Sequence, residues 1–305
     1  MSHHWGYVSA VVSAILFGAS SAFNKIALEN VNPTAVAGMT YFVAGVLLFG
    51  LHLTPLCGKI LKKLDSSETE TKITSKDFKI LAFVVVCGSI LAPLLLLNGL
   101  NITTAVNASL LLNAEPLFTV FIAYAFLNER CARREYIGIF MLLVGVIFVT
   151  TNGAFQELSI SENIIGNMLI VGACLFWGID NNLSKSLSKK RDIIMVTGLK
   201  CLIGGLVLIG LFALFGFSFE IPLMSMPYIL FVGAFSIAFS ILFFLFSLRK
   251  IGSMRTGVIF SLSSLFGAVL SFAVLREVFT LIQLVAGVVM LLGIYVLYRC
   301  GEGIK

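Results

Sequence analysis

Ten apolar stretches follow one another along the chain, separated by short polar breaks. A helix needs about 20 mostly apolar residues to cross a bilayer, so each stretch predicts one membrane-spanning helix. The predicted spans are 6–28, 34–55, 78–100, 104–127, 134–152, 163–187, 193–215, 227–249, 255–275 and 280–299. Because several breaks are only a few residues long, neighbouring helices are expected to run antiparallel. The pattern predicts an all-α membrane protein with ten transmembrane helices.

The pattern also repeats within the chain. FGASSAFNK, which starts at Phe17, matches WGIDNNLSK, which starts at Trp177, 160 residues later. The same offset pairs Gly45 with Gly205 and Gly50 with Gly210. Nearer the end of each half, an offset of 148 residues pairs Glu129 with Glu277 and Gly145 with Gly293. Five spans per repeat is an odd number, so the second copy must cross the membrane in the opposite sense. We therefore predict two inverted five-helix halves, 1–152 and 153–305, with the small residues at close helix contacts.

Composition supports a lipid environment. Charged residues make up 12% of the 305 residues and hydrophobic residues 59%, whereas soluble domains carry roughly 25% charged residues. So few charges would leave large apolar patches facing water. This composition excludes a soluble globular protein, a disordered chain and a nucleic-acid-binding protein.

Basic residues are distributed unevenly between the breaks. The break 56–77 holds five lysines, and the breaks after the fourth, sixth and eighth spans are also basic, which accounts for much of the net charge of +6. The alternate breaks 29–33, 101–103, 153–162 and 216–226 contain no lysine or arginine. By the positive-inside rule, both termini are expected in the cytoplasm and the protein in the cell membrane.

Several segments resemble a known family. They are the aromatic-glycine pairs Phe17-Gly18 and Trp177-Gly178, the stretch EPLFTVFIAYAFLNE from Glu115 to Glu129, and the Gly138-to-Gly145 spacing. Over nearly its whole length the chain resembles the drug/metabolite transporter superfamily, and within it the EamA-like group. The resemblance implies a ten-helix transporter. Most family members export amino acids, other metabolites or toxic compounds.

Two positions depart from the family pattern or from the internal repeat. The family often has a basic residue in its second span, where this chain has Thr40, whereas the repeat-related position holds Lys200. The second repeat has Ser263-Ser264 where the first has Glu115-Pro116. Any binding site is therefore expected to be asymmetric between the halves.

Three ionisable residues lie well inside the spans: Glu115, Asp180 and Lys200. On insertion scales each charge at the bilayer centre costs roughly 2.5–3.5 kcal/mol, so these groups must pair, face a cavity or be neutral. Glu115 lies near the middle of its span and shares a predicted helical stripe with Asn107 and Phe118. We hypothesise that Glu115 binds a proton or a cationic group of a substrate. The alternative is a protonated glutamate that hydrogen-bonds a neighbouring helix.

Four residues of the sixth span share one helical face: Trp177, Asp180, Asn181 and Ser184. The matching face of the first span holds Phe17, Ser20, Ser21 and Asn24. An apolar platform with convergent polar groups is typical of ligand sites. Ten residues of these faces, of the Glu115 stripe and of the seventh span are therefore predicted to bind substrate: Glu115, Asn107, Phe118, Trp177, Asp180, Asn181, Ser184, Ser20, Asn24 and Lys200. The alternative for Trp177 is packing at the start of the repeat.

The depths of the charged residues in the spans suggest further roles. Lys200 and Asp180 have matching depths, which favours a structural ion pair; the alternative is a pair that opens to bind a carboxylate or to gate the inner exit. Lys25 is expected to extend to the membrane interface. Glu129 and Glu277 are predicted to cap or clamp the helix that follows each of them.

These features predict a secondary transporter that exports amino acids or other small metabolites by alternating access. No nucleotide-binding, HExxH or GxSxG motif is found in the sequence, so we expect neither ATP-driven transport nor an enzyme, and no cofactor or metal. Proton coupling through Glu115, uncoupled facilitation and a channel all fit the sequence. Monomeric and homodimeric forms also fit, and the expected partners are a small solute and the lipid bilayer.

Overall fold

The chain folds into antiparallel helical rods, some of them composite. The computed structural model describes residues 2–29, 31–56, 58, 75–127, 135–151, 162–188, 192–215, 221–251, 253–278 and 280–301. The rods of the first half are α1 (Ser2–Ala27), α2 (Pro33–Leu53), α4–η1–α5 (Ser75–Val84, Val85–Leu91, Ala92–Ile102), α6–η2–α7 (Ala105–Leu111, Leu112–Ala114, Glu115–Leu127) and α8 (Glu135–Thr151).

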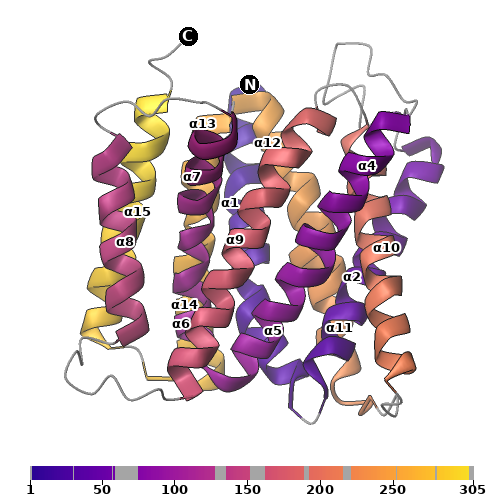
Figure 1. The fold of residues 1–305 in the computed structure, drawn as a ribbon, viewed down its shortest axis with the longest axis horizontal. Coiled ribbons are helices and arrows are strands. Elements are labelled where there is room, and N and C mark those ends of the chain that lie inside the picture. Colours follow the sequence, from indigo (N-terminus) through magenta and orange to yellow (C-terminus); the bar gives the residue numbers. More distant parts are fainter. Residues whose placement is uncertain are drawn as a thin grey trace.

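The second half repeats this order. Its rods are α9 (Glu162–Ser188), α10 (Ile193–Leu214), α11–η3–α12 (Met226–Phe231, Val232–Phe239, Ser240–Ile251), α13–α14 (Ser253–Ser261, Ser263–Leu275) and α15 (Leu281–Gly301). The described residues thus form ten rods, which confirms the ten predicted helices. α1 begins and α15 ends at the same end of the molecule (Figure 1). We call this end the termini side and the opposite end the far side.

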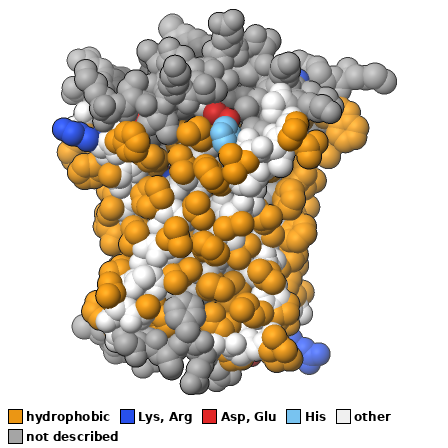
Figure 2. Space-filling view, turned by 90° about the vertical axis from the view of Figure 1, so that its right-hand side faces the viewer, with side chains coloured by type: hydrophobic (Ala, Val, Ile, Leu, Met, Phe, Trp, Pro, Cys, Tyr) orange, Lys and Arg blue, Asp and Glu red, His pale blue; other side chains and the backbone are white. Residues whose placement is uncertain are grey.

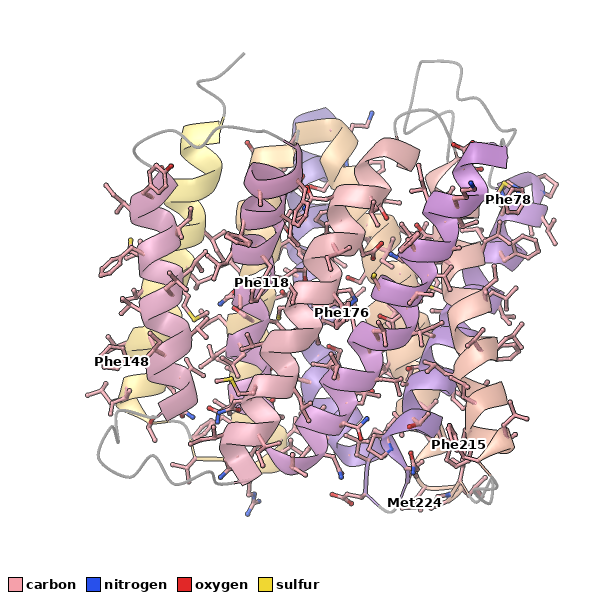
Figure 3. The ribbon with its side chains drawn as sticks, viewed as in Figure 1. Phe78, Phe118, Phe148, Phe176, Phe215 and Met224 are labelled. Carbon is pink, nitrogen blue, oxygen red and sulfur yellow. The ribbon has the colours of Figure 1, made fainter. Side chains whose placement is uncertain are left out.

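The outer surface of the rods is apolar. Among the described residues six rods are long and apolar enough to cross a membrane, and Tyr136–Val149, Ile259–Leu275 and Leu281–Val296 are shorter apolar helices. Figure 2 shows a continuous hydrophobic band on one face, with Lys and Arg only near its edges. The large side chains Phe78, Phe148, Phe215 and Met224 lie at the periphery of the rods (Figure 3) and are exposed. This surface suits a lipid solvent.

Side-chain caps begin the second rod of each half at repeat-related positions. Asn32 accepts a hydrogen bond from the backbone N–H of Thr34 at 2.9 Å, and Asp192 accepts one from Ile194 at 2.9 Å. Such caps satisfy N–H groups that a helix start leaves free. The other carboxylate oxygen of Asp192 lies 3.0 Å from the Nδ1 atom of His52, which joins the start of α10 to the end of α2. The predicted offset of 160 residues therefore reproduces a structural detail.

The first helix of each half packs among helices of the other half. α1 contacts α11–η3–α12 and α13–α14, whereas α9 contacts α4–η1–α5 and α6–η2–α7. We call the first group the α1 bundle and the second group the α9 bundle. α2 and α10 pack against each other at one edge of the two bundles, and α8 packs against α15 at the opposite edge (Figure 1). The two packing units therefore differ from the two halves of the sequence.

Glycines set the distance between α2 and α10. A methyl group on Gly45 would overlap the backbone of Leu202, and one on Gly205 would overlap the backbone of Phe42. Each residue lies 160 positions from its repeat partner, so the contact has approximate two-fold symmetry. Small residues permit such close packing where lipid provides no hydrophobic drive between helices. A methyl group on Gly50, by contrast, would meet nothing within 4 Å.

Gly45→Ala is expected to destabilise the protein by about 2 kcal/mol, because the added methyl group must push α2 away from α10. The matched control is Gly50→Ala, which adds the same group in open space. It should be neutral or stabilising by up to about 1 kcal/mol, the difference in helix propensity. Thermal unfolding of both purified variants in one detergent tests this. Equal melting temperatures would contradict the packing role of Gly45.

Four rods are irregular near mid-length. The third and eighth rods contain the π-helical segments η1 and η3, and the fourth and ninth rods break at Glu115 and Ser263. Pro116 lacks a backbone N–H, so the fourth rod cannot continue its regular hydrogen bonds there, and a 3-10 turn at Leu112–Ala114 precedes the break. The ninth rod breaks at the repeat-related position without a proline. The hydropathy pattern predicted each of these four rods as one continuous span.

Candidate functional site

The break in the fourth rod places a carboxylate at mid-depth. Glu115 begins α7, and its backbone carbonyl accepts a hydrogen bond from the hydroxyl of Thr119 at 3.0 Å. The Nδ2 atom of Asn181, on α9, donates to the Oε1 atom of Glu115 at 2.7 Å. Asn181 is exposed in the structure, although it lies within the membrane-spanning part of α9. A polar pair at this depth would be costly to expose to lipid.

A glycine allows α7 and α9 to approach closely enough for this contact. A methyl group on Gly178 would lie 2.9 Å from the Cβ atom of Phe118 and 3.0 Å from the backbone N of Thr119. Asn182 strengthens the same contact by donating to the backbone carbonyl of Thr119 at 2.9 Å. Phe118 therefore contributes its backbone and Cβ atom to helix packing, and it lies near the centre of the molecule in Figure 3.

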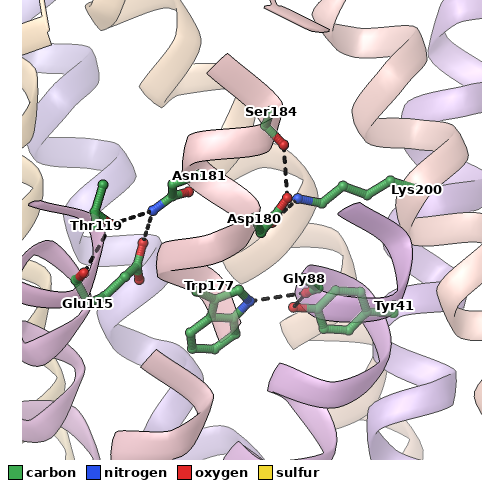
Figure 4. Close-up of polar contacts among 9 residues, drawn as sticks. All are labelled: Tyr41, Gly88, Glu115, Thr119, Trp177, Asp180, Asn181, Ser184 and Lys200. Atoms are coloured by element: carbon green, nitrogen blue, oxygen red, sulfur yellow. Dashed lines mark hydrogen bonds and ion pairs between the residues drawn. The ribbon is translucent and has the colours of Figure 1, made fainter. Parts of the chain in front are cut away.

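An ion pair lies on the neighbouring face of α9 (Figure 4). The ammonium of Lys200, on α10, donates to the Oδ2 atom of Asp180, and the hydroxyl of Ser184 donates to the Oδ1 atom at 2.8 Å. The side chain of Asp180 is 4% exposed and that of Lys200 is 17% exposed. This pairing agrees with the matched depths inferred from the sequence. A methyl group on Gly88 would overlap this carboxylate, so Gly88 provides the space that Asp180 occupies.

The π-helical segment η1 supplies a backbone acceptor to the same region. The indole N–H of Trp177 donates to the carbonyl of Gly88 at 3.1 Å, and the hydroxyl of Tyr41 donates to the same oxygen at 3.5 Å. A π-helical turn shifts the usual i→i−4 bonding, and such turns often mark functional sites. The hydrogen bond fixes the plane of the indole between Glu115 and the ion pair (Figure 4).

The structure brings together six of the ten residues that were predicted to bind substrate. Glu115, Trp177, Asp180, Asn181, Ser184 and Lys200 share α7, α9 and α10, and Phe118 packs beside them through its backbone. We call these six residues the central cluster. Tyr41, Gly88 and Thr119 also contact it and were not predicted. A tyrosine such as Tyr41 in an apolar span is only a weak sequence signal for a binding site. The carbonyl group of Gly88 gives no signal, because every residue has a backbone carbonyl.

Three predicted residues lie apart from the central cluster. Asn107 accepts a hydrogen bond at 2.7 Å from the Nε2 atom of Gln283, which joins α6 to α15. Ser20 and Asn24 are buried on α1 and make no side-chain hydrogen bond to the cluster within the described residues. The buried Oδ1 atom of Asn24 has no hydrogen-bond partner in that part of the chain, which is unusual for a structural asparagine.

The cluster suits recognition of a polar solute. Of its charged groups, Asp180 is neutralised by Lys200, whereas the described partner of the Glu115 carboxylate is the uncharged amide of Asn181. The indole of Trp177 provides an apolar surface beside both. Within the described residues no group of three or more His, Cys, Asp or Glu side chains is arranged to hold a metal ion.

Two repeats of five membrane-crossing helices around a polar cluster are the architecture of a class of protein, the membrane transporters. The profile of the EamA-like transporter family matches residues 4–151 and again residues 164–299. The chain belongs to the EamA-like transporter family. It is a multi-pass membrane transporter and not an enzyme.

Two relatives agree with this assignment, and a solved structure has the same fold. The chain is 39% identical over 303 residues to an uncharacterized transporter of Methanothermobacter thermautotrophicus, covering 99% of this chain and 88% of the relative. It is 23% identical over 294 residues to the uncharacterized transporter YetK of Bacillus subtilis, covering 95% of this chain and 86% of the relative. A crystal structure with 15% sequence identity has a TM-score of 0.66 and covers 100% of this chain and 99% of that one, which shows a shared fold.

Proposed function

We propose that the protein is a secondary carrier that exports an amino acid or another small metabolite bearing a cationic group. The central cluster binds the solute, and the two bundles expose it alternately to each side of the membrane. The termini side faces the cytoplasm in this proposal, because the breaks on that side carry most of the lysines and arginines.

The charge balance of the central cluster is the observation that carries the proposal. Glu115 and Asp180 bring two carboxyl groups, and Lys200 brings one ammonium. Pairing of Lys200 with Asp180 leaves Glu115 uncompensated within the described residues. A charge at this depth needs a partner, and a cation or a proton provides one. The pairing of Lys200 with Asp180 thus supports a structural role for this ion pair. The uncompensated charge of Glu115 supports a role for this residue in binding a proton or a cationic group.

The surroundings of Glu115 favour an organic cation. Asn181 is exposed beside it, so a solute reaching this depth meets an amide as well as the carboxylate. Trp177 is held by the Gly88 carbonyl and presents an indole surface close by. A cation with an apolar part can pair with Glu115 and pack on the indole, which also attracts cations through its ring face.

Proton exchange follows from the same geometry. The Glu115 carboxylate can hold a proton or pair with a cation, but not both at once. Inward movement of a proton on Glu115 would then drive outward movement of the solute. This coupling requires only that the bundles change conformation when the carboxyl group is occupied.

Release from preloaded liposomes tests the proposed function. Purified protein is reconstituted in vesicles that contain mixed amino acids, polyamines and other small metabolites, and release is compared with protein-free vesicles by mass spectrometry. Selective release of cationic or zwitterionic solutes, accelerated by an opposing proton gradient, is the expected result. Release that is indifferent to the gradient would indicate an uncoupled facilitator, and a conductance far above carrier turnover would indicate a channel.

A further inference from the structure

The far-side turn between α5 and α6 joins the end of one helix to the start of the next. It therefore concentrates backbone groups that have no partner within either helix: carbonyl groups at the end of α5 and N–H groups at the start of α6. Thr103 is 3% exposed, and Ala105 and Val106 are both 0% exposed, so water cannot satisfy these groups fully. Two charged side chains of other elements satisfy them instead.

Lys25 binds the carbonyl end of this turn. Its Nζ atom donates to the backbone oxygens of Leu100 at 2.6 Å, Asn101 at 3.2 Å and Thr103 at 2.6 Å. A cation is favourable at the C-terminal end of a helix, where the carbonyl groups and the helix dipole are negative. Lys25 is half-buried, and its ammonium group uses all three donors here. Extension to the membrane interface, as expected from the sequence, does not describe this geometry.

Glu277 binds the N–H end of the same turn. Its Oε1 atom accepts from the backbone N of Ala105 at 2.9 Å, and its Oε2 atom accepts from Val106 at 2.8 Å. Helix N-termini favour such anions. The preceding residue, Arg276, has a φ of 55°, the only positive value for a non-glycine among the described residues. This turn out of α14 directs Glu277 toward α6, and not toward the following helix as the repeat had suggested.

Both side chains come from the opposite bundle. Lys25 lies on α1 and Glu277 follows α14, whereas the turn belongs to the α9 bundle. The two opposite charges also attract each other. We call Lys25, Glu277 and the turn between α5 and α6 the far-side clamp. It fastens the two bundles to each other at one end of the molecule.

The bundles also pack tightly between the clamp and the middle of the molecule. The amide of Asn113 donates to the hydroxyl of Ser264 at 2.7 Å, between η2 and α14. A methyl group on Gly267 would lie 2.6 Å from the hydroxyl oxygen of Ser109, between α14 and α6. On the termini side no comparable packing joins α7 to α13 within the described residues, and Asn181 is exposed. Among the described residues, the two bundles are therefore joined more tightly on the far side than on the termini side.

We propose that the far-side clamp is the gate that holds the transporter closed toward the far side, and that it must release for the central cluster to open there. This proposal rests on the proposed function only for alternating access. It does not depend on the solute or on the role of Glu115. When the clamp opens, Lys25 and Glu277 lose buried, charge-assisted hydrogen bonds and become hydrated. The clamp therefore shifts the equilibrium away from the state that is open to the far side.

Thiol labelling from each side tests the gate without any substrate. In a variant whose six cysteines are replaced, Ser109→Cys reports the far-side seam and Ser184→Cys reports the termini side. A membrane-impermeant maleimide is applied to oriented vesicles from the corresponding side. With the clamp intact, the far-side reporter should react slowly and the termini-side reporter faster.

Lys25→Gln and Glu277→Gln should each raise the labelling rate of the far-side reporter about 10-fold or more and lower that of the termini-side reporter. Lys25→Arg keeps the cation and should behave like the parent. Lys79→Gln, which removes an exposed lysine on the termini side, is the matched charge control and should change neither rate. An unchanged far-side rate in the two clamp variants would overturn the gate. So would a rise at both reporters, which indicates general loosening.

Discussion

Glu115→Gln should lower the rate of solute release by about 10- to 100-fold, the effect of losing one charge-assisted hydrogen bond of about 1.5–3 kcal/mol. Glutamine keeps the size of the side chain and an oxygen that accepts from Asn181, so the fold should survive. The variant cannot exchange a proton, so its remaining transport should no longer depend on pH. In the parent protein, acid on the binding side should weaken solute binding, because a protonated carboxyl group cannot pair with a cation.

Liposome release measured at several pH values, together with thermal unfolding, provides the test. Glu29→Gln is the matched control, because Glu29 is exposed beyond the far-side end of α1. It should leave both rate and pH dependence unchanged. A Glu115→Gln protein with parental rate and pH profile would show that Glu115 is a structural residue that only bonds a neighbouring helix.

Removing one partner of the Asp180–Lys200 pair should cost about 3–5 kcal/mol of stability, because the remaining charge is buried and unpaired. Asp180→Asn and Lys200→Gln are therefore each expected to reduce the yield of folded protein severely. The double variant removes both charges and should recover most of the loss, since an ion pair of this kind contributes little net stability. Thermal unfolding of the three variants gives the coupling energy of the pair.

Transport by the double variant then separates two roles. Retained transport would agree with a structural pair, the role that the full pairing of Asp180 favours. A folded double variant without transport would show that the pair binds the solute or gates its exit. The charge-swapped protein, with Asp180→Lys and Lys200→Asp, provides an independent check. Recovery of both folding and transport would again indicate a structural pair.

Much of the fold follows from the sequence because lipid imposes a simple rule. Each span has to be long and apolar, so run lengths located the ten helices, and the odd number per repeat predicted their inversion. The glycine pattern was informative where a partner backbone approaches, as at Gly45. It failed at Gly50, since a repeated glycine can also persist where the structure has open space.

The site was predictable as far as helix geometry stays regular. Asp180, Asn181 and Ser184 share a face of one continuous α-helix, so their spacing placed them together. Asn107 was expected on the Glu115 stripe, but the 3-10 turn between them interrupts that stripe. Asn107 bonds to Gln283 instead.

Other site contacts leave no trace in a hydropathy pattern. The Gly88 carbonyl accepts from Trp177 within the π-helical segment η1. The residue types of Val85–Leu91 do not predict a π-helical turn. The partner of Glu277 likewise could not be read from the repeat. The repeat pairs equivalent positions of the two halves, whereas this contact joins Glu277 to a residue of the first half that is not its repeat partner.

The exchange of first helices between the halves has a consequence for biosynthesis. The hydroxyl of Ser13 on α1 donates to the backbone carbonyl of Ser240 at 2.8 Å, 227 residues further along the chain. α1 therefore enters the membrane long before its neighbours are translated, and it must wait there until α12 and α14 are inserted. A product of half the length would lack those neighbours altogether. It could regain them only from a second copy threaded through the bilayer in the opposite orientation.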